Sequence, residues 1–279
     1  MNNTIWTVKG GKVLGPAPFF IAGIVNVTPD SFYDGGEHDS VDASVAHGLL
    51  LAEQGAHILD IGGESTRPYA DHVSAEDEMA RVIPVIKELA EANGNTVLSV
   101  DTYKAEVAAA ALEAGADILN DVSACAFDPA LLDIIGQFKP GYVLMHSLGR
   151  PEDMQDAPQY DDVVDTLLAF FESRLEMLDK VGLPRDRIVL DPGIGFGKLL
   201  EHNLTILKNI NRFEKLGLPL YMGLSNKSLW QGLLGLGVGE RQNATQVATA
   251  LLAAKGVPIH RVHEVNLARQ TLTIVQEIA

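Results

Sequence analysis

Two observations on the sequence predict an α/β fold, a (β/α)8 TIM barrel. Eight apolar segments of strand length recur along the 279 residues, and segments of helix length lie between them. The apolar segments are rich in Ile, Val and Leu and alternate little with polar residues, which is typical of parallel strands covered on both faces. A doubly wound sheet usually has about five or six strands, so the count favours the closed barrel, which typically needs about 250 residues.

The predicted strands and helices alternate in one continuous rhythm. The strands are residues 21–27, 57–61, 96–100, 117–122, 142–146, 187–190, 219–224 and 259–265. Segments with polar starts at 40–54, 74–92, 103–114, 160–181 and 242–255 are predicted helices. Gly55, Gly115, Gly182 and Gly256 each follow a predicted helix and precede a strand, where a helix end favours glycine.

No linker or low-complexity segment interrupts this rhythm, so the sequence predicts a single domain over residues 1–279. Residues 4–14, with Gly10 and Gly11 at their centre, predict a short N-terminal hairpin that closes the bottom of the barrel.

Composition excludes several classes of function. The chain has 21 basic and 37 acidic residues and a net charge of -16, which argues against a nucleic-acid partner and against a polybasic membrane anchor. No apolar stretch is long enough to span a membrane, and the N-terminal segment lacks the features of a signal peptide. We therefore expect a cytoplasmic protein. A single cysteine, Cys125, cannot form an internal disulfide and is expected in the core.

Every predicted strand ends in polar residues. One such residue is more often a turn former or a helix N-cap than a catalyst. Eight together are different, because the C-terminal ends of barrel strands meet at one rim, where active sites of this fold lie. Buried polar groups there need partners, and a ligand is a natural one. The residues are Asn26, Asp60, Asp101, Asn120, Asp121, His146, Asp191, Ser225 to Ser228, Arg261 and His263.

Some of these residues suit an anionic ligand despite the acidic total. Arg261 and His263 are two positions apart on the eighth strand and so share one face, and Lys227 follows the seventh strand. Phosphate sites in this fold often lie around strands seven and eight. The alternative for Arg261 is a salt bridge at the rim. Asn26 and Asp34 offer oxygen ligands suited to a Mg²⁺ ion that carries a diphosphate, although no set of carboxylates is spaced for a full protein cage.

Seven ordered motifs resemble the dihydropteroate synthase family, a pterin-binding TIM-barrel family, over roughly residues 20 to 270. The first two are loops, long, polar and glycine-rich, of the kind that closes over a substrate. The matching segments are residues 26–32, 62–68, 101–104, 118–121, 144–146, 191–198 and 261–263.

The resemblance implies a transferase of folate biosynthesis. It would condense 6-hydroxymethyl-7,8-dihydropterin diphosphate with p-aminobenzoate to give 7,8-dihydropteroate and diphosphate, and it would use Mg²⁺. The same resemblance implies a homodimer and a target of sulfonamides.

Carried over position by position, the resemblance also implies residue roles. The pterin ring would be held by Asp101, Asn120, Met145, Asp191 and Lys227. The diphosphate would be held by Asn26, Arg261 and His263, with Asn26 as the metal ligand. The p-aminobenzoate pocket would be formed by Phe32, Thr66, Arg67, Pro68, Phe196, Lys198 and Ser228. Catalysis would depend on Asp101, Lys227, Asp34 and Arg67.

One departure from the family pattern concerns the pterin wall. The family usually has Ser-Arg-Lys-Ser after strand seven, whereas this chain has Asn226 in place of the arginine. Asparagine is shorter and neutral, so we expect weaker affinity for the pterin diphosphate, or compensation from a neighbour. A second, milder departure is Glu264 in place of aspartate.

Two alternatives share the pterin-holding residues. One is a methyltransferase that uses methyl-tetrahydrofolate, which would lack the arylamine-covering loops at 26–32 and 62–68. The other is a non-catalytic pterin-binding relative, which would be expected to lose diphosphate residues such as Arg261 and His263.

Overall fold

The computed structural model describes residues 3–27, 37–65, 70, 72–92, 94–150, 154–156 and 158–279, with the backbone alone for 37–40. Eight parallel strands form one sheet in the order β8-β7-β6-β5-β4-β3-β10-β9. A bridge between Leu190 and Leu220 joins its two edges and closes the barrel, as predicted. The strands are β3 (Phe20–Asn26), β4 (Ile58–Gly62), β5 (Val97–Asp101), β6 (Ile118–Asp121), β7 (Gly141–Met145), β8 (Ile188–Asp191), β9 (Tyr221–Met222) and β10 (Ile259–Val262).

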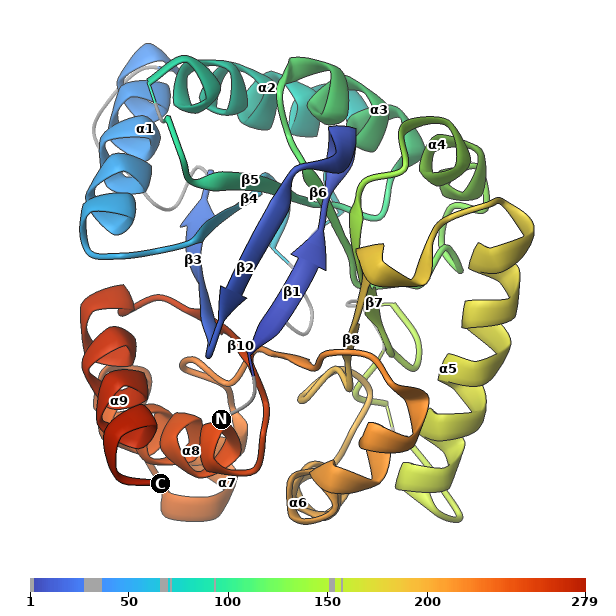
Figure 1. The fold of residues 1–279 in the computed structure, drawn as a ribbon, viewed down its shortest axis with the longest axis vertical. Coiled ribbons are helices and arrows are strands. Elements are labelled where there is room, and N and C mark those ends of the chain that lie inside the picture. The colour runs from blue at the N-terminus through green and yellow to red at the C-terminus, as the bar shows by residue number, and fades with distance from the viewer. Residues whose placement is uncertain are drawn as a thin grey trace.

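Helices surround the barrel, as Figure 1 shows. All five predicted helices are present within a few residues of their expected bounds. The four glycines predicted at helix ends have φ of 104°, 126°, 77° and 87°, which side chains other than glycine rarely adopt. The helices are α1 (Glu37–Glu53), α2 (Ala75–Ala92), α3 (Ala105–Ala114), α4 (Leu131–Phe138), α5 (Val163–Lys180), α6 (Leu200–Lys208), α7 (Leu229–Leu234), α8 (Gln242–Ala254) and α9 (Val265–Ile278).

The last two strands are shorter than predicted. β9 has two residues in place of six. Pro219 has no N–H to donate, and Leu220 forms only an isolated bridge to Leu190. β10 ends at Val262 because α9 begins at Val265. His263 therefore lies just beyond the strand.

The predicted hairpin is present and closes the bottom of the barrel. Strands β1 (Thr4–Thr7) and β2 (Val13–Ala17) pair antiparallel, and Gly10 and Gly11 have φ of 71° and 80° in the turn between them. In Figure 1 the hairpin crosses the end of the barrel that faces the viewer. Its buried side chains, Trp6, Val8 and Leu14, pack with residues at the starts of the barrel strands.

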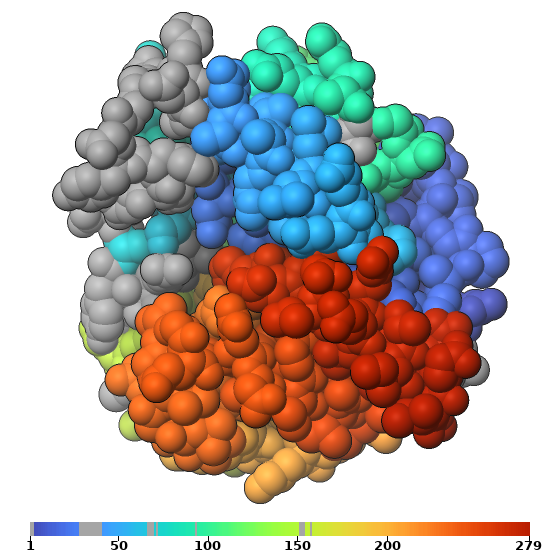
Figure 2. All heavy atoms as spheres, turned by 90° about the vertical axis from the view of Figure 1, so that its left-hand side faces the viewer, coloured from blue at the N-terminus to red at the C-terminus, as the bar shows by residue number. Residues whose placement is uncertain are grey.

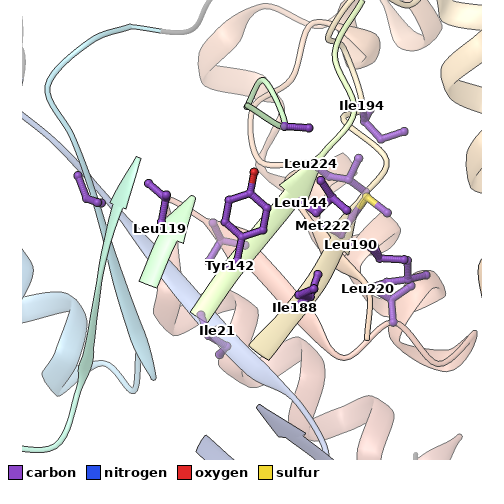
Figure 3. Close-up of a cluster of buried hydrophobic side chains, with 14 of the residues drawn as sticks. Ile21, Leu119, Tyr142, Leu144, Ile188, Leu190, Ile194, Leu220, Met222 and Leu224 are labelled. Atoms are coloured by element: carbon purple, nitrogen blue, oxygen red, sulfur yellow. The ribbon is translucent and has the colours of Figure 1, made fainter. Parts of the chain in front are cut away.

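The core has two layers, one on each face of the barrel wall. The outer layer lies between strands and helices, and Figure 3 shows part of it, including Leu119, Leu144, Leu190 and Met222. The inner layer is apolar at the strand starts, with Ile58, Val97, Ile118, Val143, Val189 and Ile259. Two to four residues further along, the interior becomes polar, with Asp60, Ser99, Asp101, Asn120, Asp191 and Arg261. The strand register thus brings the polar residues together at one end.

Within the part of the chain that the structure describes, no helix has the length and apolar character needed to cross a bilayer.

The Trp6→Ala variant tests the role of the hairpin as a plug. Trp6 is 1% exposed, and its Nε1 donates to the carbonyl of Arg187 at 2.8 Å. We expect its loss to lower the free energy of unfolding by about 3–5 kcal/mol, measured by urea unfolding. The Ile5→Ala variant on the same strand, at a side chain 56% exposed, should change it by less than about 0.5 kcal/mol. Equal losses in the two variants would contradict the role of Trp6.

Candidate active site

An arginine held between two buried carboxylates lies at the centre of the polar end. Arg261 on β10 donates from Nε to Oδ2 of Asp60 at 2.5 Å and from Nη2 to Oδ2 of Asp101 at 2.7 Å. Asp60 also accepts from Oγ of Ser99 at 2.5 Å and from Nδ2 of Asn120 at 3.0 Å. Since β10 and β5 are not neighbours in the sheet, these contacts cross the barrel interior. One network therefore joins β4, β5, β6 and β10.

Burial and mutual charge determine the protonation of this network. Burial raises the pKa of Asp101 to about 7, and the nearby Asp60 adds to the effect while Arg261 opposes it. Burial disfavours the charged Arg261, but Asp60 and Asp101 outweigh it and raise its pKa above the usual value. Oδ1 of Asp101 is buried and has no hydrogen-bond partner among the described residues. Asp101 is thus the weakly satisfied carboxyl of the pair, placed to meet a ligand.

Lys227 and Asp191 lie beside the network and form a second pair of polar groups. Burial lowers the pKa of Lys227 to about 8, although Asp191 opposes the shift. Burial raises the pKa of Asp191, although the N–H of Gly193, which donates to its Oδ1 at 2.7 Å, opposes the shift. The site thus offers a cationic donor and a carboxylate acceptor side by side, which suits a ring that carries both donors and acceptors.

Apolar side chains form a wall next to these polar groups. Tyr103, Val122, Met145, Met154 and Phe196 form one buried cluster. The ammonium of Lys227 lies 4.1 Å from the ring centroid of Phe196, at cation–π distance. A flat ligand with a polar edge can therefore pack on the wall and bond to the charges.

The glycine-rich loop after β8 is tightly fixed. Gly193 and Gly197 have φ of 65° and 60°, and a side chain at either would collide with the carbonyl of His146 or Leu148. Lys198 is 2% exposed, and its ammonium contacts Nδ1 of His146 at 2.9 Å and the carbonyls of Gly193 and Phe196 at 2.9 Å each. These partners show that Lys198 holds the loop that carries Phe196, and the substrate contact that the resemblance implied for it stays a prediction.

A buried lysine also anchors the start of the second predicted loop. Lys104 bonds to Oε2 of both Glu64 and Glu78. Oε1 of Glu64 accepts from the hydroxyl of Tyr103 at 3.0 Å and from the N–H of Val73 at 3.1 Å. Glu64 therefore joins the two ends of the segment 64–73.

The residues predicted to hold the diphosphate lie at the rim. Asn26 is exposed at the end of β3. His263 is half-buried, with its Nδ1 2.9 Å from Oγ of Ser225. Arg261 is one-fifth exposed at its side chain. Within the described ranges, no group of three or more His, Cys, Asp or Glu side chains is arranged to hold a metal ion by itself.

The backbone conformation at position 226 explains why asparagine can stand there, which the sequence alone did not indicate. Its φ of 56° is left-handed, a conformation that asparagine tolerates better than arginine. The neighbouring Arg241 does not take the place of the arginine that the resemblance leads us to expect at this position. It is 6% exposed, and its guanidinium donates to the carbonyls of Leu236 and Asn226 and to the side chain of Gln231.

The structure thus brings Asp101, Asn120, Asp191, Lys227 and Arg261 together, with Met145 and Phe196 in the adjoining wall. Ser228 is exposed just before α7. The remaining predicted residues, Phe32, Asp34, Thr66, Arg67 and Pro68, lie outside the described residues.

Sequence reasoning did not assign a role to Asp60 or Ser99, although both belong to the network. A signal was present for each. Ser99 lies two positions before Asp101 on one strand, and Asp60 lies two positions after the inward-facing Ile58. The period of two in a strand places such residues on the same face.

Several known proteins are similar to this chain in sequence and in fold. The family model described as "Pterin binding enzyme" matches residues 22–263. A dihydropteroate synthase of Escherichia coli strain K12 is 40% identical over 256 residues, or 92% of this chain and 90% of that protein. A Xanthomonas albilineans dihydropteroate synthase solved with 4-aminobenzoic acid has a TM-score of 0.91 at 42% identity, over 99% and 98% of the two chains. The structure of a dihydropteroate synthase of this organism in complex with 7,8-dihydropteroate has a TM-score of 0.87 at 40% identity, over 97% and 98%.

The chain belongs to the family of pterin binding enzymes. Its reaction is that of a dihydropteroate synthase, a transferase of folate biosynthesis. The methyltransferase and non-catalytic alternatives therefore find no support in these comparisons.

The Asp101→Asn variant tests the protonation of the network. The folded-state pKa of about 7 lies above the ordinary value of 3.8, so the folded protein binds a proton that the unfolded chain releases. The stability from this proton is full below about pH 4 and is lost as the pH rises through about 7. Urea unfolding across this range should show a flatter pH dependence in the variant.

The Asp179→Asn variant is the matched control. Hydrogen bonding to Arg185 lowers the pKa of the half-exposed Asp179, so its replacement should leave the pH dependence in this window unchanged. A wild-type slope in the Asp101→Asn variant would contradict the assignment.

Proposed function

We propose that the described rim residues divide the synthase reaction into a pterin part, a diphosphate part and an arylamine part. In the pterin part, Asp101, Asn120, Asp191 and Lys227 bond to the edge of the ring. Met145 packs beside it in the apolar wall. The observation that carries this proposal is the convergence of these residues, which come from β5, β6, β8 and the segment after β9, at one end of a closed barrel.

In the diphosphate part, Arg261 supplies charge-assisted hydrogen bonds. A guanidinium has five N–H donors. Among the described residues, its Nε serves Asp60 and its Nη2 serves Asp101 with one N–H each, so three of the five remain for a phosphate. His263 lies beyond the end of the same strand, at the rim.

Mg²⁺ is the ion that suits this part. It prefers oxygen ligands and usually binds through one or two protein groups together with substrate phosphates. Asn26, exposed at the rim, offers one such oxygen. When bound, the ion would neutralise charge on the leaving diphosphate.

The chemistry then needs positioning and electrostatics rather than a nucleophilic side chain. The C–O bond between the pterin methylene and the diphosphate breaks, and its electron pair leaves with the diphosphate. The lone pair of the arylamine nitrogen forms the new C–N bond, and the nitrogen releases a proton. Arg261 and His263 stabilise the charge on the leaving group. The carboxylate of Asp101, in the buried interior, stabilises the cationic methylene.

We place Phe196 and Ser228 in the arylamine part. The ring of Phe196 lies against the ammonium of Lys227, and Ser228 directly follows Lys227 in the chain. We assign Lys198 to this part as a positioning residue, through the loop that carries Phe196. Phe32, Asp34, Thr66, Arg67 and Pro68 complete the proposal as expectations from the resemblance.

We also propose a cytoplasmic homodimer in which each chain acts as one domain. One outer-layer cluster runs from Phe19 to Val275, which supports the single domain. Exposed apolar side chains gather on the last helices, with Leu234 of α7, Leu251 of α8 and Ile274 of α9 more than half exposed. Figure 2 shows these helices, in orange and red, as one continuous face. Exposed apolar side chains that gather on one face are typical of a protein interface. Sedimentation equilibrium, which measures the mass of the assembly in solution, tests the homodimer.

Diphosphate release is the direct test of the proposed roles. We expect release only when the pterin diphosphate, p-aminobenzoate and Mg²⁺ are all present. The Arg261→Met variant should lower kcat/KM for the pterin diphosphate about 100-fold, because it removes charge-assisted hydrogen bonds. The Arg185→Met variant, at an exposed ion pair with Asp179, should keep wild-type kinetics. Normal turnover in Arg261→Met, or release without the arylamine, would refute the roles.

The Asn226→Arg variant tests the altered pterin wall. Restoring the family's arginine should lower KM for the pterin diphosphate about tenfold, the effect of one added contact of about 1.4 kcal/mol. The left-handed φ of 56° should make this gain cost about 1–2 kcal/mol in stability, measured by urea unfolding. Asn226→Ala is the control, since it loses the same backbone tolerance without adding a cation. If Asn226→Arg has unchanged KM and turnover, the expectation is wrong.

A further inference from the structure

Asp60 links three strands of the site through its side chain, and neither the resemblance nor the reaction assigned it a role. It is fully buried, and its two oxygens accept hydrogen bonds from three side chains on three other strands. Two of the donors, Asn120 and Arg261, are residues proposed above to bind substrate. The third, Ser99, has no proposed contact with substrate.

We propose that Asp60 is a positioning residue that fixes the orientation of Asn120 and Arg261 for the pterin diphosphate. The inference rests on the proposed roles of those two residues. Asp60 itself does not reach the reacting atoms. It acts by deciding which atoms of its two partners remain available.

Asp60 fixes the orientation of the Asn120 amide. The side-chain amide of asparagine has one accepting oxygen and a nitrogen with two N–H donors. Nδ2 of Asn120 donates one N–H to Oδ2 of Asp60, which leaves Oδ1 and the second N–H for a ligand. The reversed amide would place an oxygen against the carboxylate, which is repulsive. Asn120 therefore presents its oxygen in a fixed position, so a ring with an N–H opposite Oδ1 is favoured over an analogue with a bare ring nitrogen there.

Asp60 also fixes the plane of the Arg261 guanidinium. A guanidinium is planar, so the bond from Nε to Asp60 determines where the two Nη groups point. Asp101 is the weaker anchor. Each carboxylate makes one bond to Arg261, but Ser99 and Asn120 also hold Asp60, whereas Asp101 keeps one buried oxygen without a partner among the described residues. When the pterin engages Asp101, Asp60 still holds Arg261 in place.

A purely structural role for Asp60 explains the observations less well. Burying a carboxylate is costly, and a well-packed apolar group of similar volume is often equally stable. The inward-facing residue two positions earlier on β4 is Ile58, which shows that this strand accepts an apolar inward residue at its start. The charge at position 60 is therefore better explained by what it orients.

The test compares Asp60→Asn with Ser99→Ala, which removes the one hydrogen bond of Asp60 that leads to no substrate residue. We expect Asp60→Asn to lower kcat/KM for the pterin diphosphate about 10- to 100-fold and to leave KM for p-aminobenzoate within about twofold. We expect Ser99→Ala to stay within about threefold on both. If Asp60 were merely structural, each variant would lower kcat/KM only in proportion to the free energy of unfolding that it loses.

An NMR readout on the ligand-free protein reports the orientation directly. The Nε–H signal of Arg261 should be protected from exchange with water in the wild type and in Ser99→Ala, and should lose this protection in Asp60→Asn. Should Asp60→Asn not fold, Asp60→Glu keeps the charge and displaces the carboxylate by one methylene, and the same kinetic loss is expected.

The Arg261→Met and Asn120→Ala variants separate this inference from the proposed function. If these two variants keep a normal kcat/KM for the pterin diphosphate, the proposed roles fail. If they impair it while Asp60→Asn matches Ser99→Ala, the roles stand and the positioning role of Asp60 is refuted.

Discussion

The ion pair between Arg261 and the buried carboxylates of Asp60 and Asp101 is the interaction on which the arrangement of the site depends. Arg261 comes from β10, which is a neighbour of neither β4 nor β5, so the ion pair forms only when the sheet curves around the interior. Charges buried in this way are stable only when each finds partners, which the surrounding serine and asparagine provide. Fold and site are therefore coupled, since a shift in strand register would separate the arginine from its carboxylates.

The other cations near this network are held by different means. Lys227 is placed between a carboxylate and an aromatic ring, and burial brings its pKa towards neutrality. Lys198 is surrounded by carbonyls and a histidine nitrogen, and it holds the backbone of the loop after β8 in place. The charged residues thus separate into those whose donors or acceptors remain available for a ligand and those whose bonding capacity is used within the protein.

The sequence predicted the strands, the hairpin and the polar rim because these follow from local pattern and from the common direction of parallel strands. It could not predict how the polar groups pair. Arg261 was expected either at a diphosphate or in a salt bridge, and in the ligand-free structure it makes two ion pairs. Lys198 carried a motif signal, yet its partners depend on how the loop folds. The left-handed backbone at Asn226 was equally beyond reach of sequence pattern, because asparagine occurs in many conformations.

The hairpin at the base of the barrel has a consequence for the order of events. Trp6 and its neighbours close the lower end of the interior, so groups that bind at the level of Asp101 and Asn120 can enter and leave only past the rim. A compartment with one opening imposes an order of binding. A molecule that binds at the level of Asp101 and Asn120 must arrive before one that binds nearer the opening.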